Sequence, residues 1–450
     1  MVTVMVRRRL PPHPGFRLPL VTLLEFRRDP LSFLLKLART YGDIVFFRLG
    51  TSPVYLLSHP DYIKSLLVTH HSHIVKGKGF ERTKYLIGDG LLTSEGETHR
   101  WQRRLAQPSF SPRWNIIYGS VMTRYADEIT NRWHDGETRD IYRDITDLTL
   151  GVVGEALFGS DVSESEEIKD AIAEFMTWWH QMLIPYGYIV EKIPWLPANR
   201  RRDKARQTID RVLYRIIGER RRGPTSSGDL VSALLRATDP ETGRSLSDEQ
   251  LRDIAVTIFI AGQETTASAI TWTLYLISQH PEVEARLQEE VDSVLGGRLV
   301  TAEDVPRLVY TRMVLAEALR RYPPAWVLGR RVVKDIEVGR YRIPRGSGVL
   351  VSQYVTHHDP RFFPDPFRFD PERWTPEAEA ARPDFCYFPF GAGPRSCIGE
   401  SFAWLEGTIV IATIAQRWRL RHVPEHRVAV LPSVTLRPKY GMVMKLYRRH

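Results

Sequence analysis

The most informative part of the sequence is the loop Phe388-Pro389-Phe390-Gly391-Ala392-Gly393-Pro394-Arg395-Ser396-Cys397-Ile398-Gly399. Cys397 stands at the end of a turn rich in glycine and proline, and an apolar run without proline follows from Ser401 to Arg417. This order predicts that the cysteine precedes a helix N-terminus, where partial positive charge favours the thiolate over the thiol. Gly391 and Gly393 can adopt positive φ and leave room for a flat ligand beside the backbone.

A thiolate presented in this way can bind haem iron, and Arg395 can reach an anion beside the haem. The simpler interpretation is a buried structural cysteine, the usual fate of a lone cysteine. The wider pattern Phe390-x-x-Gly393-x-Arg395-x-Cys397-x-Gly399 favours the iron ligand, because it resembles the haem-binding loop of the cytochrome P450 family. The resemblance implies that Cys397 binds the iron of haem b and that Phe390, Arg395 and Gly399 contact the cofactor.

The composition is that of a large globular protein. The chain has 450 residues, of which 43% are hydrophobic, enough for an extensive buried core. Its formal net charge of +10, from 63 basic and 53 acidic residues, suits an acidic partner. We find no aromatic and basic nucleic-acid-binding module, so we expect an acidic protein partner and no nucleic acid.

Two features of the sequence concern its cellular compartment. The only cysteines are Cys386 and Cys397, and a disulfide between them would remove the iron ligand. We therefore expect a reducing cytosol and a free Cys386 packed as a small hydrophobe. The apolar stretch from Met1 to Val6 is too short for a signal peptide, and no run of about 18 apolar residues occurs, so we expect a cytoplasmic protein without a membrane span.

The order of the chain predicts a mainly α fold with a small β-rich region near residues 44–58 and 330–355. We expect an irregular N-terminal segment at residues 1–29 and a single haem-thiolate catalytic domain at residues 30–450. The resemblance implies the cytochrome P450 fold, with a long central helix over the haem. The local expectations are a helix at 30–41, a hairpin around Gly50-Thr51-Ser52, a short helix at 60–68, an irregular glycine-rich stretch at 73–97, helices through 114–222 and a flexible linker at 223–228.

The section from Phe175 to Trp195 is unusually aromatic. It can be ordinary core between helices. The family resemblance suggests instead the lid of the substrate channel, where aromatic lining would suit a large apolar substrate. The sequence does not decide whether this section contacts other helices, substrate or a membrane surface.

His99 and Arg103 stand four residues apart on a predicted helix, so they share one face and can both donate to carboxylates. The simpler interpretation is two solvated cations on a basic helix. In the family, residues at this spacing followed by a sequence such as Pro108-Ser109-Phe110 hold the haem propionates. The resemblance assigns this role to His99 and Arg103, although many members have tryptophan at the first position.

A helix of roughly 50 Å is predicted from a capping box at Ser247 and Gln250 to about His280. Its middle reads Ala261-Gly262-Gln263-Glu264-Thr265-Thr266. A glycine inside a helix costs about 1 kcal/mol relative to alanine, so Gly262 is expected to have a packing or functional reason.

The same segment carries the predicted catalytic residues. Thr265 lies one turn after Ala261 and can bond its carbonyl, which would loosen the helix locally. This resembles the oxygen-binding groove of the family. The resemblance places Ala261 at the cofactor and makes Glu264 and Thr265 the acid and alcohol that deliver protons.

Glu317 and Arg320 place an acid and a base three residues apart on one predicted helix face. Alone, such a pair is usually a surface ion pair worth a few tenths of a kcal/mol. In the family, this motif pairs with an arginine in a Pro-Glu-Arg-Trp sequence, here Arg373, to form a buried structural triad. Arg330, ahead of a strand-like segment, has a family counterpart that contacts a propionate.

The resemblance implies a haem-dependent monooxygenase that inserts one oxygen atom from O2 into an apolar small molecule of the fatty acid, terpenoid or steroid type. The electrons would come from separate redox proteins, an acidic ferredoxin or flavodoxin with its reductase. Arg100, Arg104 and Arg113 are candidates for an exposed basic patch that attracts this partner.

Three alternatives remain open at this stage. A peroxide-driven haem peroxygenase would share the fold, but such enzymes typically lack the Glu264–Thr265 pair. A non-enzymatic haem carrier or gas sensor would have no use for a proton relay. A cysteine-nucleophile hydrolase would need a histidine near Cys397 and would leave the glycine and arginine loop without a role.

Overall fold

The structure, a computed structural model, describes residues 10–15, 19–159, 166–183, 193, 195–222 and 228–449. The chain divides into two units. The first comprises Met1–Arg82, Ala325–Arg368 and Ala380–Cys397, and the second comprises Thr83–Pro324, Phe369–Glu379 and Ile398–His450.

The first unit is built on a five-stranded sheet. The β-branched and aromatic residues of β1 (Ile44–Leu49) and β2 (Ser52–Leu57) pair as an antiparallel hairpin around Gly50, whose φ is 59°. β2 then pairs in parallel with β8 (Gly348–Val351), and the strand order is β1-β2-β8-β5-β3. The predicted hairpin and both predicted β-rich regions are confirmed. The remaining strands of this unit are β3 (Ile74–Lys76), β5 (Leu328–Val332), β6 (Ile336–Val338) and β7 (Tyr341–Ile343).

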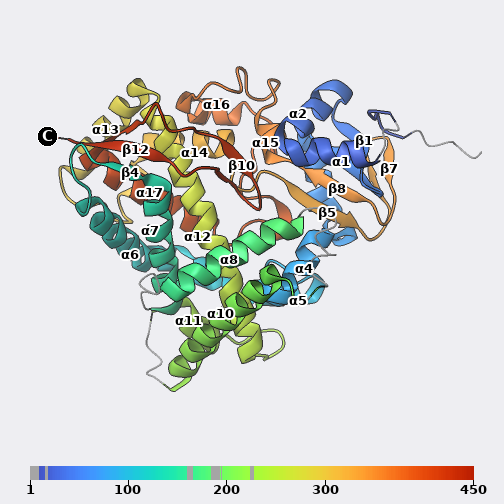
Figure 1. Ribbon diagram of the computed structural model, residues 1–450, viewed down its shortest axis with the longest axis horizontal. Helices are drawn as coiled ribbons and strands as arrows, with labels where there is room; N and C mark the ends of the chain where they lie inside the picture. The colour runs from blue at the N-terminus through green and yellow to red at the C-terminus, as the bar shows by residue number, and fades with distance from the viewer. Residues whose placement is uncertain are drawn as a thin grey trace, which may run out of the picture. The chain divides into compact units, whose positions relative to one another are not determined.

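Two helices cover the start of this sheet. The predicted helix α2 (Pro30–Tyr41) begins at Asp29, whose carboxylate accepts the N–H of Ser32 at 3.0 Å. α1 (Pro19–Arg28) precedes it and packs against α2 and β1 (Figure 1). The expectation of an irregular segment at residues 1–29 is therefore wrong for α1, because proline is tolerated in the first turn of a helix. Residues 1–9 and 16–18 lie outside the described part of the chain.

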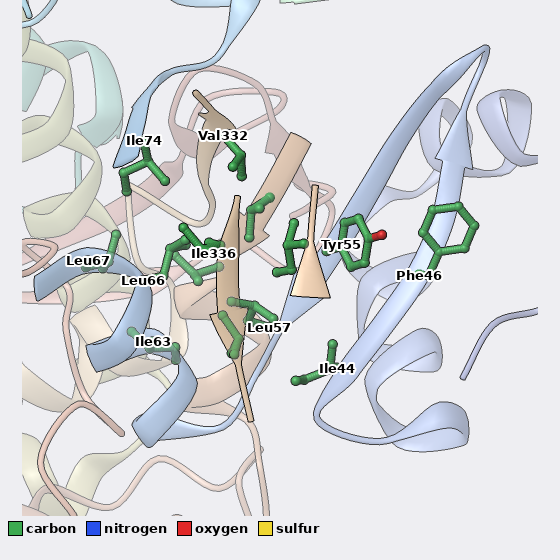
Figure 2. Close-up of a cluster of buried hydrophobic side chains, with 14 of the residues drawn as sticks. Ile44, Phe46, Tyr55, Leu57, Ile63, Leu66, Leu67, Ile74, Val332 and Ile336 are labelled. Atoms are coloured by element: carbon green, nitrogen blue, oxygen red, sulfur yellow. The ribbon is translucent and has the colours of Figure 1, made fainter. Parts of the chain in front are cut away.

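The core of the first unit joins the sheet to the loop that carries the cysteine. Figure 2 shows side chains from β1, β2, β6 and the short helical segment around Leu66 in one buried cluster. Phe388, the first residue of the cysteine loop, belongs to this cluster. The loop is therefore anchored in the core at its beginning. The short helical elements here are α3 (Pro60–Lys64), η1 (Ser65–Thr69), η2 (His71–His73), α15 (Gln353–His357) and η6 (Gly393–Arg395).

The second unit surrounds the long helix α12 (Asp248–Ser278). Its predicted capping box is confirmed, because Ser247 Oγ accepts the N–H of Gln250 at 3.2 Å and Gln250 Oε1 accepts the N–H of Ser247 at 3.0 Å. α12 contacts several other helices of this unit, and four of them make its most extensive contacts, as can be followed in Figure 1. These are α7 (Ile141–Phe158), α10 (Pro197–Arg222), α14 (Val309–Arg321) and α17 (Glu400–Arg417).

The other elements of the second unit complete a mainly helical structure with small sheets, as predicted. β4 (Thr138–Asp140), β12 (Val443–Arg448) and β9 (Trp418–His422) form one sheet, and β10 (Val430–Pro432) pairs with β11 (Leu436–Pro438). The remaining helical elements are α5 (Gly96–Ala106), η3 (Gln107–Phe110), α6 (Pro112–Asn131), α8 (Glu166–Leu183), α11 (Leu230–Arg236), α13 (Pro281–Leu295), η4 (Val305–Arg307) and η5 (Pro371–Trp374). Two short helices, α4 (Lys78–Ile87) and α16 (Pro376–Ala380), cross the boundaries between units.

Other local expectations need correction. The stretch 73–97 is not wholly irregular, because it contains β3 and α4. Its glycines serve close packing: a Cβ on Gly90 would lie 2.2 Å from the carbonyl oxygen of Asp253. Strand β4 interrupts the region 114–222, which was expected to be helical. Most of the predicted linker, residues 223–227, lies outside the described residues.

The aromatic section is described only in part. Phe175, Trp178 and Trp179 are buried on α8, which packs against α10 in the second unit. Residues 184–192 and Pro194 lie outside the described part of the chain. For the described aromatic residues of α8, core packing is the observed role.

Among the described residues, no helix is both long and apolar enough to cross a membrane.

Candidate functional site

The cysteine loop of the first unit is closed by its own backbone. The N–H of Cys397 donates to the carbonyl of Phe390 at 2.9 Å, and the N–H of Ser396 donates to the carbonyl of Gly393 at 3.0 Å. A further bond of 2.9 Å joins the N–H of Gly391 to the carbonyl of Phe388. These bonds hold a short loop in one shape with the cysteine at its end.

Two glycines allow this shape. Gly391 and Gly393 have φ angles of 72° and 70°, in the left-handed region where a side chain is disfavoured. A Cβ on Gly393 would lie 2.4 Å from the carbonyl oxygen of Leu67 in η1, which is a severe overlap. A Cβ on Gly391 would lie 3.6 Å from Leu328 at the start of β5. The loop is therefore packed against η1 and β5, and Gly393 is required by both its φ and its neighbour.

His357 fixes the beginning of the loop. Its Nε2 accepts the N–H of Phe388 at 3.1 Å, so the neutral ring carries its proton on Nδ1. The histidine is fully buried on α15, and its ring lies tilted against that of Tyr387 at a centroid distance of 5.0 Å. It is a positioning residue that sequence reasoning did not identify.

The two cysteines differ in exposure. Cys397 is exposed, whereas Cys386 is buried, and neither of the two forms a disulfide. Burial raises the pKa of Cys386 to about 11, so this thiol stays protonated at neutral pH. The expectation that Cys386 is a buried free thiol is confirmed. A protonated, covered thiol is unsuited to metal binding, which leaves Cys397 as the accessible sulfur ligand.

Two predicted anion-binding arginines belong to the same unit as the cysteine. Arg330 lies in β5, two residues after Leu328, and donates to the carbonyl of Gly329 at 3.0 Å. Arg395 is partly exposed within η6, two residues before Cys397. The structure thus places both arginines on elements that pack directly against, or form part of, the cysteine loop.

The other predicted propionate ligands belong to α5 in the second unit. His99 is buried and Arg103 is partly exposed one turn later on the same helix. The turn after α4 fixes α5 to α12: Gln102 Nε2 donates to the carbonyl of Asp89 at 2.6 Å, and the N–H of Asp89 donates to Asp253 Oδ2 at 2.7 Å.

The end of this region is tied to the helix that follows the cysteine loop. Ser401 Oγ, in the first turn of α17, donates to the carbonyl of Phe110 at 3.1 Å. Gly399, predicted to contact the cofactor, is the N-cap residue of α17. The predicted helix after the cysteine therefore exists, and within the second unit it begins beside the segment that continues α5.

The central helix shows the predicted threonine bond. Thr265 Oγ1 donates to the carbonyl of Ala261 at 2.6 Å, and both residues are accessible to solvent. Gly262 has a packing reason, because a Cβ there would lie 3.0 Å from Cγ2 of Val153 on α7. The glycine lets α7 and α12 approach closely, and Thr265 is accessible on a helix fixed by that contact.

Glu264 lies in a different environment from its neighbour. Its side chain is buried, and Oε1 accepts the hydroxyl of Thr435, just before β11, at 2.8 Å. Arg437 Nη1 lies 3.7 Å from the same oxygen, and no described residue bonds Oε2. Burial raises the pKa of Glu264, although Arg437 and Thr435 act in the opposite direction. A carboxyl of this kind can hold a proton that an exposed glutamate would lose.

Tyr142 of α7 completes this buried group. Burial, with the nearby charge of Glu264 as a smaller cause, raises the pKa of Tyr142 to about 12. The phenol therefore remains neutral near Glu264. The acid and the alcohol predicted as a pair, Glu264 and Thr265, make separate hydrogen bonds in this structure.

The predicted triad is present in the second unit. Glu317 and Arg320 are 0% exposed, and Arg320 donates twice to Glu317, at 2.7 and 2.8 Å. Arg373 Nε lies 3.5 Å from Glu317 Oε1. Two further donors reach the same carboxylate: the indole N–H of Trp374 at 3.0 Å and the N–H of Asp370 at 3.1 Å. The glutamate therefore joins α14 to η5.

Comparison with known proteins identifies the arrangement. The model of the family described as cytochrome P450 matches residues 11–444. The chain belongs to the cytochrome P450 family. It is 40% identical to cyclooctatin synthase of Streptomyces melanosporofaciens over 92% of this chain and 90% of that protein, and 33% identical to pentalenene oxygenase of Streptomyces avermitilis over 92% and 91%. The crystal structure of the cytochrome P450DA heme domain superposes with a TM-score of 0.87 at 28% identity, covering 98% of this chain and 97% of that one.

As a P450, this chain is a monooxygenase that uses haem b and O2. Its residues fit that cofactor. In the first unit, a loop closed by its own hydrogen bonds presents the exposed thiol of Cys397 together with Arg395, and Arg330 lies on the neighbouring strand β5. The thiol suits a haem iron, and the chemistry of the two arginines suits the anionic carboxylates of a haem. Gly393 cannot carry a side chain without moving the loop that holds the thiol.

Some residues of this P450 site escaped sequence reasoning. Thr435 and Arg437 lie about 170 residues after Glu264, and no pattern links them. Trp374 belongs to the Pro-Glu-Arg-Trp motif, but the sequence did not indicate that its indole N–H donates to a carboxylate. Arg104 is exposed, as expected for contact with a redox partner, and it also donates to the buried Asp239 at 2.9 Å. Its charge is therefore committed to a local ion pair.

Proposed function

We propose that this P450 is a terpenoid monooxygenase supplied with electrons by an acidic ferredoxin or flavodoxin and its reductase. The substrate class is supported by the relatives cyclooctatin synthase and pentalenene oxygenase, which act on terpenoids. The assignment of the site rests on the exposed thiol of Cys397. This residue lies on a loop that is closed by the hydrogen bond from the N–H of Cys397 to the carbonyl of Phe390. A cytoplasmic location agrees with two cysteines that are not joined in a disulfide.

In this proposal Cys397 binds the haem iron, and Phe390, Ala261 and Gly399 line the cofactor. When bound, the haem supplies O2 activation, which thiolate ligation favours. Arg330, Arg395, His99 and Arg103 hold its carboxylates. Their charge and hydrogen bonds fix the orientation of the cofactor, and the protein supplies positioning and protons.

Two residues of α12 would transfer protons to the site. Thr265 Oγ1 is accessible and donates its proton to the carbonyl of Ala261, so it can accept one hydrogen bond without moving and can donate one only after its hydroxyl turns away from Ala261. Glu264 is the internal carboxyl of raised pKa, and rotation of its side chain away from Thr435 would bring a proton from the buried group to the accessible helix face. In this arrangement Glu264 stores the proton and Thr265 delivers it.

Spectroscopy tests whether Cys397 is the iron ligand. The reduced carbon monoxide complex should show the shifted Soret band of thiolate-bound haem in the wild type and in Cys386→Ala. Cys397→Ala should lose this band. Retention of the shifted band in Cys397→Ala would overturn the ligand assignment.

The substrate class is tested with labelled oxygen. The purified holoenzyme, with a ferredoxin and its reductase, is offered cyclic terpene hydrocarbons and alcohols, long-chain fatty acids and steroids. We expect terpenoids alone to shift the spin state and to gain one atom from labelled O2. Turnover of fatty acids or steroids without terpenoids would contradict the substrate class, and turnover with hydrogen peroxide but not with the reductant would favour a peroxygenase.

A further inference from the structure

The helix α1 (Pro19–Arg28) leaves an apolar surface open to solvent. Leu20, Val21 and Leu24 are 63%, 41% and 54% exposed, although large aliphatic side chains usually bury most of their surface. At 100° per residue these three side chains lie on one face of the helix. Exposed apolar side chains grouped in this way mark an interaction site more often than single ones do.

The opposite face of α1 is already used by the fold. Leu23 and Thr22 are buried, and the ring of Phe26 meets that of Phe33 on α2 at a centroid distance of 5.8 Å. α1 contacts α2 and β1, which lie beside it in Figure 1, and the buried side chains determine which face of the helix remains outside. The helix is apolar on both faces over its first two turns, a pattern that requires cover on both sides.

Basic side chains continue the open face. Arg27 and Arg28 are exposed in the last turn, three and four residues after Leu24, and so follow the same stripe. In the sequence, Arg7, Arg8, Arg9 and Arg17 stand shortly before the helix. Aliphatic residues flanked by arginines form the chemistry that binds the surface of an anionic bilayer.

We propose that the open face of α1, formed by Leu20, Val21, Leu24, Arg27 and Arg28, docks this P450 onto membranes that contain anionic phospholipid. The leucines enter the boundary between headgroups and acyl chains, and the two arginines contact phosphate groups. Binding is peripheral and reversible. It would place the enzyme where apolar substrates accumulate.

A second protein is a poorer occupant of this face. In a symmetric dimer formed through α1, Arg27 and Arg28 would be brought near their own copies, where like charges oppose contact. Three aliphatic side chains also offer far less than the roughly 800 Å² per partner that a stable protein interface buries. A bilayer needs no such area, because its affinity grows with each inserted side chain and each nearby cation.

The test is vesicle binding by the full-length holoenzyme. Vesicles of phosphatidylglycerol and phosphatidylcholine should bind the wild type, and vesicles of phosphatidylcholine alone should bind it much less. Leu20→Ser with Leu24→Ser should lower the partition coefficient at least tenfold. Arg27→Gln with Arg28→Gln should lower it about fivefold for each arginine at low salt, and the difference should disappear at high salt.

Matched variants separate this face from general properties of the surface. Leu299→Ser removes an exposed leucine of the second unit, and Arg345→Gln with Arg448→Gln removes two exposed charges elsewhere. These variants should bind vesicles as the wild type does, and every variant should keep its carbon monoxide spectrum.

Three results would overturn the proposal. The first is wild-type binding no stronger to anionic vesicles than to neutral ones. The second is unchanged binding of the leucine variant together with loss of binding when residues 1–9 are deleted, which would assign the contact to that segment. The third is a concentration-dependent dimer, seen by sedimentation velocity, that disappears in the leucine variant.

Discussion

Thr435 donates a hydrogen bond of 2.8 Å to Glu264 and so ties the turn between β10 and β11 to the middle of α12. The carboxyl is buried, and its second oxygen accepts no hydrogen bond from the described residues. Burial raises the pKa of Glu264, and the hydroxyl of Thr435 acts against that rise because it stabilises the ionised form. Thr435 is therefore positioned to set both the direction and the proton affinity of this side chain.

The first prediction concerns this bond. Thr435→Val should raise the pKa of Glu264 further, because it removes a donor to the carboxylate while keeping the volume of the side chain. The carbonyl stretch of protonated Glu264, assigned by infrared comparison with Glu264→Gln, should persist to higher pH in Thr435→Val than in the wild type. Thr435→Ser keeps the donor and should restore the wild-type pH dependence. An identical band in all three proteins would show that Thr435 does not act on Glu264.

The second prediction concerns the accessible alcohol. Thr265→Ala should continue to consume reductant while product falls by about 10²-fold and hydrogen peroxide rises, because a proton donor at this position is lost. Thr265→Ser retains the hydroxyl that donates to Ala261 and should keep most of the coupling. Product yield per reductant in Thr265→Ala equal to that of the wild type would remove the proposed role of the threonine.

The third prediction concerns the carboxylate of Glu317. Arg320→Ala leaves a fully buried charge without its main partner, which costs about 3–5 kcal/mol, so the variant should be recovered largely without haem or unfolded. Trp374→Phe removes one indole N–H and should lower the free energy of unfolding by about 1–3 kcal/mol while the protein stays folded. Arg312→Ala, an exposed position on the same helix, is the control. Folded, haem-loaded Arg320→Ala of wild-type stability would contradict the structural role of the triad.

Local patterns predicted the parts of this protein whose causes are local. Three such features depend on residues three or four positions apart and can therefore be inferred from the sequence. They are the capping box at Ser247, the helix after Asp29 and the threonine bond to Ala261. The glycines of the cysteine loop belong to the same class, although the resemblance to a family was needed to give that loop a role.

Contacts between distant segments could not be foreseen. Thr435 reaches Glu264 from near the end of the chain, and Asp239 pairs with the exposed Arg104, for which the sequence indicated no partner. Gly90 was interpreted as a sign of irregular structure, whereas it allows a close approach to Asp253 on α12. In each case the cause is a neighbour in space that no spacing in the sequence reveals.

The fourth prediction concerns Glu406, which is fully buried on α17 with no described hydrogen-bond partner for either oxygen. Burial raises the pKa of Glu406 well above its ordinary value. The unfolded chain loses this proton near pH 4 to 5, whereas the folded protein keeps it, so the contribution to stability is complete below that range and declines as pH rises toward the folded pKa. Within this window the decline is about 1.4 kcal/mol per pH unit.

Glu406→Gln removes the titration while keeping the shape of the side chain. Its free energy of unfolding, measured by urea denaturation from pH 5 to about pH 8, should fall less steeply than that of the wild type. Glu400→Gln, at the exposed start of the same helix, should retain the wild-type slope. Equal slopes for Glu406→Gln and the wild type would show that Glu406 ionises freely in the folded protein.

The last prediction concerns the redox partner. Arg113 and Arg100 are exposed at the start of α6 and on α5, whereas Arg104 is engaged by Asp239 and Glu241. Arg100 contacts Glu97, but an ion pair this exposed is weak and leaves the arginine available to a partner. We therefore assign the electrostatic attraction of an acidic ferredoxin to Arg100 and Arg113. Arg104, the third arginine proposed from the sequence for this basic patch, is excluded.

Charge reversal at Arg100 and Arg113 should slow electron transfer from the ferredoxin and flatten its dependence on ionic strength. The reason is that charges at the rim of an interface act mainly on the association rate and are screened over about 10 Å at 0.1 M salt. Arg345→Glu with Arg448→Glu changes the net charge equally at exposed positions elsewhere and should leave both the rate and the salt slope nearly unchanged. If both double variants slow the reaction to the same extent, net charge alone attracts the partner. If the Arg100 and Arg113 variant keeps the wild-type rate and slope, the ferredoxin docks on another face.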